Sequence, residues 1–165
     1  MKFTAEIRYD AAPADVFAMV SDQRFQVEVC TATGAVSHSV QVEQSADGGA
    51  TVTTSRDLPT DGFPDYVKGF VGQTLTVRRV DVWAPADSDG GRTGTLSVEI
   101  PGAPVRLDGT LLMSAHEGGG TLEVVDGDLK ASIPLLGGKV ERSAEPAIRS
   151  AISKEQEVGR RWLAR

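Results

Sequence analysis

The chain has 165 residues, of which 40% are hydrophobic and 24% charged, and this length and composition are typical of one globular domain and exclude a globally disordered chain. Its 23 acidic and 17 basic side chains give a formal net charge of −6, which argues against nucleic acid binding because such proteins usually present a basic face. Cys30 is the single cysteine, so an intrachain disulfide bond is excluded.

The first residues carry no pattern of export or membrane insertion. Residues 1–10 alternate polar and apolar side chains and contain no apolar run like that of a signal peptide. No stretch approaches the roughly 18 apolar residues that a membrane-spanning helix needs. We therefore expect a cytoplasmic protein without a membrane span.

Residues 2–29 predict one strand followed by two short helices. Phe3, Ala5, Ile7 and Tyr9 alternate with polar side chains, a period of two that is typical of a half-buried strand. Pro13 favours the start of a helix, and Ser21-Asp22 can end it and cap a second helix.

A predicted hairpin follows from residue 33 to residue 57. Val36, His38, Val40 and Val42 share one face, which we expect to point inward, and Asp47-Gly48-Gly49 is a hairpin-type turn. His38 is then either a satisfied core residue or a pocket group with a shifted pKa.

The pattern breaks between residues 58 and 72, where three glycines and two prolines occur. This segment also carries Phe63, Tyr66, Val67, Phe70 and Val71, so we expect a short helix or a packed loop. Aromatic side chains can cover an apolar ligand and glycines can act as hinges, so the segment is predicted to be a mobile lid.

Residues 74–133 predict further strands that pair with their neighbours in a meander. In residues 74–84 the apolar positions change parity at Arg78-Arg79, which suggests a β-bulge. Asp108 is expected to point outward, whereas Asp126 shares its alternation with Leu122 and Val124 and can point inward.

Residues 139–163 predict one long amphipathic helix, because apolar residues recur every three or four positions. Pro146 lies inside this pattern and should kink or interrupt the helix. Glu155 interrupts the apolar stripe, so it either faces a polar pocket or an arginine such as Arg78 or Arg79, or it lies at the margin of the stripe.

One long helix can fill the concave side of so large a sheet only if the sheet curls, and this arrangement often leaves a cavity. The sequence resembles the START-like, or polyketide cyclase-like (SRPBCC), helix-grip superfamily. The resemblance spans nearly the whole chain and rests on the opening strand with Ala12-Pro13-Ala14-Asp15-Val16-Phe17 and on residues 133–141 leading into the last helix. Residues 58–64 and Asp81-Val82-Trp83 resemble an actinobacterial branch of unknown function.

The resemblance implies a single START-like domain over residues 1–165, of class α+β. Its curled antiparallel sheet of about seven strands would wrap around the long C-terminal helix, with two short helices after the first strand. It also implies a pocket for an apolar ligand, and it implies no catalytic set.

The residues give little support to catalysis or metal binding. His38 and His116 are the only histidines, which is too few for a typical zinc site. Cys30 is expected to be a structural thiol, and Asp108 with Asp126-Gly127-Asp128 an outward polar face rather than an acid–base pair. We therefore predict no catalytic residues, no metal and no cofactor.

The preferred function is non-enzymatic binding or carriage of a small hydrophobic or amphipathic ligand in an internal pocket. The alternatives are a polyketide cyclase- or aromatase-like enzyme and a protein-interaction domain with a packed core, whose protein partner would be unknown. The predicted pocket residues are Tyr9, His38, Val40, Phe63, Val67, Phe70, Leu107, Leu111, Met113, Ile148, Ala151 and Glu155.

Overall fold

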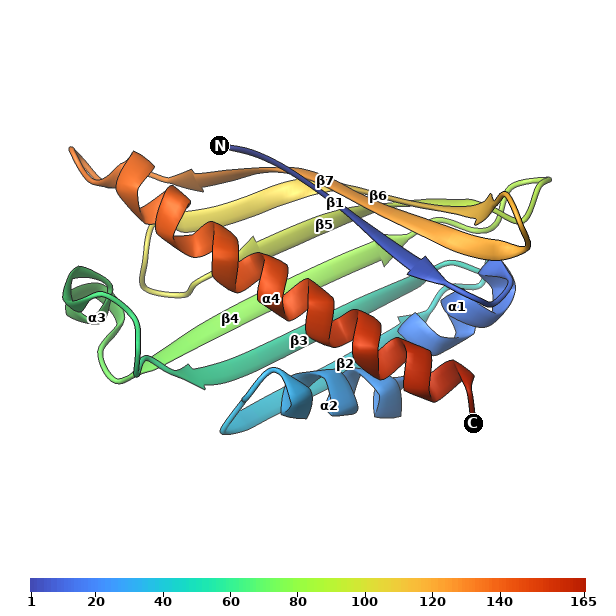
Figure 1. The fold of residues 1–165 in the computed structure, drawn as a ribbon, viewed down its shortest axis with the longest axis horizontal. Helices are drawn as coiled ribbons and strands as arrows, with labels where there is room; N and C mark the ends of the chain where they lie inside the picture. The colour runs from blue at the N-terminus through green and yellow to red at the C-terminus, as the bar shows by residue number, and fades with distance from the viewer.

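A computed structural model describes residues 1–165 and contains seven strands and four helices. The strands form one antiparallel sheet in the order β1-β7-β6-β5-β4-β3-β2, and the longest helix, α4, crosses it (Figure 1). The elements are β1 (Lys2–Tyr9), α1 (Pro13–Val20), α2 (Gln23–Ala32), β2 (Ser37–Gln44), β3 (Ala50–Pro59), α3 (Asp65–Val71), β4 (Thr74–Trp83), β5 (Arg92–Glu99), β6 (Val105–His116), β7 (Gly120–Ala131) and α4 (Gly137–Leu163). This order confirms the predicted α+β helix-grip class.

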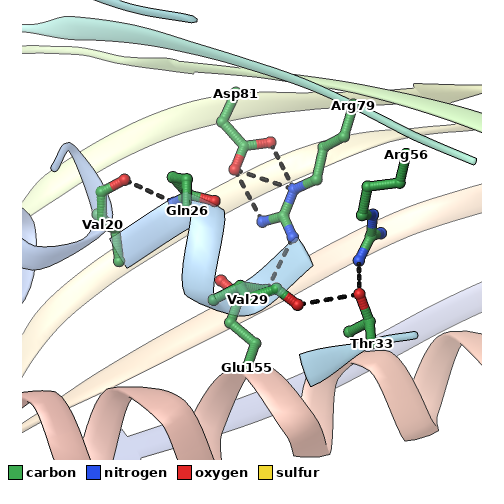
Figure 2. Close-up of polar contacts among 8 residues, drawn as sticks. All are labelled: Val20, Gln26, Val29, Thr33, Arg56, Arg79, Asp81 and Glu155. Atoms are coloured by element: carbon green, nitrogen blue, oxygen red, sulfur yellow. Dashed lines mark hydrogen bonds and ion pairs between the residues drawn. The ribbon is translucent and has the colours of Figure 1, made fainter. Parts of the chain in front are cut away.

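The two short helices begin and end as the sequence predicts. Pro13 opens α1, and the Asp22 side chain caps α2 by accepting a hydrogen bond from the Arg24 backbone N–H at 2.7 Å. The side chain of Gln26 then donates to the carbonyl of Val20 at 2.7 Å, which ties α2 to the end of α1 (Figure 2). The two helices are thereby held as one unit against the sheet.

The helix α4 runs as one element of 27 residues through Pro146. Its buried positions, Val140, Glu155, Val158 and Gly159, follow the predicted stripe. Gly159 lies so close to Tyr9 of β1 that an added Cβ would stand 2.5 Å from the Tyr9 ring, so only glycine allows this approach. The predicted long helix is confirmed.

The predicted β-bulge at Arg78-Arg79 is wrong. The pairing of β4 with β3 is uninterrupted, with Ser55 opposite Arg78 and Thr54 opposite Arg79. The parity of the apolar residues changes because Arg79 and Asp81 occupy inward positions of a regular strand, whereas Val82 points outward and is 45% exposed. Two charged side chains therefore lie on the concave face.

The two ends of the sheet are covered differently. At one end α1, α2 and the C-terminal half of α4 pack together on the concave face, whereas α3 stands apart at the other end (Figure 1). A cluster of 17 buried apolar residues, including Phe17, Phe25, Trp83, Leu111 and Met113, forms the core. No helix has the length and apolar character needed to cross a membrane.

Candidate functional site: an internal cavity with a polar end

An apolar cavity of about 210 Å³ lies between α4 and the concave face of the sheet. Of its 29 lining residues, 24 are hydrophobic, and they come from the strands, from α4 and from the segment that carries α3. Burying an apolar molecule here would remove its surface from water, which is the main driving force for binding such a ligand.

The space exists because α4 presents small side chains to the sheet at this point. Ala144, Ala147 and Ala151 lie on its cavity face, spaced three or four residues apart, and Ile148 and Ile152 follow the last two of them. Larger side chains at the alanine positions would fill the gap between helix and sheet. The cavity is therefore encoded in the helix sequence.

One end of the cavity is polar and closed by a buried ion cluster. The Arg79 guanidinium on β4 donates from Nε and Nη2 to the Asp81 carboxylate, with the shortest contact at 2.7 Å, and from Nη1 to Glu155 Oε2 on α4 at 2.9 Å (Figure 2). Burial raises the pKa of Asp81, although the Arg79 guanidinium beside it favours the charged form. All three nitrogen atoms of the Arg79 guanidinium therefore donate to carboxylates.

Arg56 on β3 lies beside this cluster but has no carboxylate partner. Its Nη1 donates to the hydroxyl oxygen of Thr33 at 2.9 Å, and the Thr33 hydroxyl contacts the carbonyl oxygen of Val29 near the end of α2 (Figure 2). The same hydroxyl also contacts the carbonyl oxygen of Cys30 at 3.0 Å. Its Nε is buried and has no hydrogen-bond partner. Burial lowers the pKa of Arg56, and the nearby Arg79 charge adds to this effect.

Two further polar groups are buried next to the cluster and do not line the cavity. Glu123 on β7 is 1% exposed, and its Oε2 has no hydrogen-bond partner. Burial, with the nearby Glu155 carboxylate, raises the pKa of Glu123 to about 8. Burial, followed by the charges of Glu155 and Glu123, also raises the pKa of Tyr9, whose hydroxyl is likewise unpartnered.

The opposite end of the cavity is covered by the segment between β3 and β4. Phe63, Val67, Phe70 and Val71 contribute to the lining there. The Tyr66 hydroxyl contacts the Ser143 hydroxyl of α4 at 2.6 Å, and the Lys139 ammonium lies 4.7 Å from the centre of the Tyr66 ring. These contacts fasten α3 to the first turns of α4.

Residues 4–163 match the family described as "Protein of unknown function (DUF2505)". The chain belongs to the DUF2505 family. The uncharacterized protein Rv0481c of Mycobacterium tuberculosis (strain H37Rv) is 30% identical to it over 118 residues, which are 71% of this chain and 67% of the relative.

Three solved structures share the fold of this DUF2505 protein. A START superfamily protein from Mycobacterium smegmatis has a TM-score of 0.57 at 15% identity and covers 98% of both chains. The lipid transfer and protein localization domain of human StarD13 has a TM-score of 0.59 at 12% identity, over 96% of this chain and 76% of that one. Zhui aromatase/cyclase from Streptomyces sp. R1128 has a TM-score of 0.59 at 10% identity, over 96% of this chain and 90% of that one. These matches confirm the predicted START-like fold.

Seven of the predicted pocket residues line the cavity of this DUF2505 protein. They come from the α3 segment, from β6 and from α4, and they are Phe63, Val67, Phe70, Leu107, Ile148, Ala151 and Glu155. Glu155 is 5% exposed and contacts Arg79, as one of the two interpretations of the helix stripe predicts.

His38 lies opposite Arg56 and shares its face of the sheet, but it does not reach the cavity. His38 is exposed and Val40 only partly buried, and neither lines the cavity. Both lie on β2, the edge strand of the sheet, whose inner side faces α2 rather than α4. The prediction failed because the valine-rich alternation of an edge strand indicates a face without saying what covers it.

Tyr9, Leu111 and Met113 point inward as predicted but do not line the cavity. They lie at the end of the sheet that α1, α2 and the last turns of α4 cover, so they belong to the packed core. Asp126 is exposed, as the preferred interpretation of an outward polar face predicts, and the inward alternative is wrong because Glu123 and Val125 are the buried residues of that part of β7.

The sequence interpretation assigned no role to Arg56, Asp81 or Glu123. Arg56 follows Val52 and Thr54 at intervals of two residues, so the alternation of β3 contained a signal for its inward position. The contact between Arg79 and Glu155, which are 76 residues apart, was indicated only by the interruption of the α4 stripe at Glu155. No group of three or more His, Cys, Asp or Glu side chains is placed to hold a metal ion.

Proposed function

We propose that this DUF2505 protein binds and carries a small hydrophobic or amphipathic molecule in its internal cavity without transforming it. The observation that carries the proposal is the cavity of about 210 Å³ with 24 hydrophobic lining residues. START-like folds often bind hydrophobic ligands, and one structural neighbour is a lipid transfer domain by its name.

The size of the cavity favours a compact ligand. Pockets for drug-sized molecules typically have volumes of about 300–1,000 Å³, and this one is smaller. A molecule with a single short chain or a small ring system suits this volume, whereas a two-chain membrane lipid would need α3 to move outward. An interior with this much space does not suit the alternative of a packed protein-interaction domain.

The arrangement of acids and bases favours carriage over catalysis. Asp81 and Glu155 are engaged by Arg79, and Glu123 and Tyr9 do not line the cavity. A general acid or base needs to reach the reacting atom directly or through one water. Glu155 is therefore the one carboxylate that borders the cavity and could act on a bound substrate.

A cyclase-like activity is the second candidate because Glu155 borders the cavity and one structural neighbour is an aromatase/cyclase by its name. The test is incubation with a linear polyketide mimic, followed by mass spectrometry of the products. Turnover that Glu155→Gln abolishes while the fold is retained would favour the enzyme over the carrier.

Native mass spectrometry tests the carrier function directly. The protein is purified from the organism that encodes it, and the spectrum is recorded under conditions that preserve noncovalent complexes. We expect a bound species of defined mass that is released unchanged on denaturation. A spectrum of the bare protein alone, with no uptake from a total lipid extract of that organism, would contradict the proposal.

A further inference from the structure

The polar end of the cavity contains two arginines in different situations. Arg79 is paired with two carboxylates, through four nitrogen–oxygen contacts to Asp81 and Glu155 at no more than 3.1 Å. Arg56 makes one hydrogen bond, to the uncharged hydroxyl of Thr33, and forms no ion pair with any carboxylate. Of the two guanidiniums, Arg56 is the one that has N–H donors without a partner in the protein.

The position of Arg56 places these donors where a ligand can meet them. Arg56 is paired with Val77 of β4 in the sheet. Arg79 lies two residues further along β4, where it is paired with Thr54. Arg56 therefore stands between the apolar part of the cavity and the closed ion cluster, and it is a lining residue. A buried guanidinium Nε without a partner is costly, because a desolvated donor loses its hydrogen bonds to water.

From this arrangement we infer that Arg56 anchors an acidic head group, so that the ligand is an amphipathic acid whose carboxylate meets Arg56 and whose apolar part fills the cavity. The inference rests on the proposed function. Arginine is suited to this role because its planar guanidinium can donate two parallel hydrogen bonds to one carboxylate.

The neighbouring charges are compatible with a bound carboxylate. The charged groups near Arg56 are Arg79 and Glu155, with the Cys30 thiol also close, and Glu155 is already engaged by Arg79. Glu123 adds little negative charge at neutral pH because its raised pKa keeps it largely protonated. Arg56 and Arg79 together balance the formal charges of Asp81 and Glu155, so a ligand carboxylate would meet a site without net negative charge.

The test compares decanoic acid with 1-decanol, which has the same chain length and no charge. Dissociation constants are measured by isothermal titration calorimetry at pH 7.5 for the parent chain and for Arg56→Gln. Arg78→Gln is the matched control, because Arg78 is the neighbouring arginine on β4, is exposed, and pairs with Glu99. We expect Arg56→Gln to weaken decanoate binding by about tenfold or more, the usual cost of losing a charge-assisted hydrogen bond.

Decanol binding should change by less than about twofold in Arg56→Gln, and Arg78→Gln should bind both compounds like the parent, because neither change touches the apolar contacts. Equal weakening of decanoate and decanol in Arg56→Gln would show that Arg56 serves only the structure and would overturn the inference. Equal binding of both compounds by the parent and by the variant would overturn it as well, while leaving the carrier function intact. No binding of either compound by the parent would contradict the carrier function itself.

A second measurement does not depend on the stability of the variant. The carbon resonance of [1-¹³C]decanoic acid bound to the parent chain reports the ionisation of the carboxyl group through a pH titration. Contact with Arg56 should lower the pKa of the bound acid below that of the free acid. A bound pKa that is raised above the free value would place the carboxyl group in an apolar environment and overturn the inference.

Discussion

Glu123 is a carboxyl group in the middle of the core without a hydrogen-bond partner. Burial and the Glu155 charge raise its pKa to about 8, so the folded protein holds a proton there that the unfolded chain has already lost at neutral pH. Since the folded state binds the extra proton, stability is highest below the unfolded pKa and falls as the pH rises toward 8. Glu123 therefore makes stability fall with rising pH between the unfolded pKa and about pH 8, above which its effect no longer changes.

Glu123→Gln should remove this sensitivity. Between about pH 5 and 8 the parent should lose up to about 1.4 kcal/mol per pH unit from this one group, and the variant should show a flatter profile. The measurement is urea unfolding at four pH values, with Glu117→Gln as a control because Glu117 is exposed in the β6–β7 turn. Identical slopes for the parent and Glu123→Gln would show that Glu123 is ionised in the folded state at neutral pH.

The buried charges also show that the inward or outward direction of single residues could not always be predicted from the sequence. Arg79 and Asp81 alternate with Val80 and Val82, so the rule that apolar residues face inward predicted a bulge that would turn these valines inward. Glu155 was found because it interrupts a stripe that repeats over a helix of 27 residues. A short strand gives too few repeats for its polar inward positions to stand out against its apolar outward ones.

At the scale of the element, the account depends on the cavity face of α4. Ile148 lines the cavity and packs against the core, so Ile148→Asp would place an unpaired carboxylate in an apolar environment. We expect a loss of more than about 2 kcal/mol in the free energy of unfolding. Ser150→Asp, which adds the same charge on the exposed side of α4, should cost less than about 0.5 kcal/mol. Equal thermal midpoints for the two variants would mean that α4 does not pack against the sheet through this face.

The helix α3 is expected to open more readily than the rest of the fold. It has seven residues, none of them buried, and the flanking Gly62 and Gly72 have φ angles of 86° and 78° that favour glycine. We expect rapid amide hydrogen exchange in residues 63–72 that slows when decanoic acid is added, because the ligand would contact Phe63, Val67 and Phe70 from inside.

Strand β6 provides the internal reference for this measurement, since it is paired on both sides within the sheet. Tyr66→Phe should speed the exchange of α3 further by removing the contact with Ser143. Protection of α3 as strong as that of β6 in the absence of ligand would exclude a lid that opens.

At the scale of the molecule, the order of elements and the architecture could be predicted, because long periodic patterns determine them. The strand β1 (Lys2–Tyr9), the paired short helices and the helix over residues 139–163 each carry several repeats of their period. The two ends of the sheet could not be told apart in this way. Whether Leu111 packs against α1 or borders a cavity depends on which helix covers it, and local periodicity contains no such information.

The central claim is that the space under α4 is a ligand site, and Ala151→Phe tests it most directly. Ala151 lines the cavity, so a phenylalanine there should fill the space at a cost of only about 1–3 kcal/mol in stability. The measurement is the fluorescence of Nile red, an uncharged apolar dye, titrated with the parent, with Ala151→Phe, and with Ser153→Phe, which adds the same ring on the exposed side of α4. The account predicts saturable binding by the parent and by Ser153→Phe and no binding by a folded Ala151→Phe. Binding of the dye by Ala151→Phe with the affinity of the parent would contradict it.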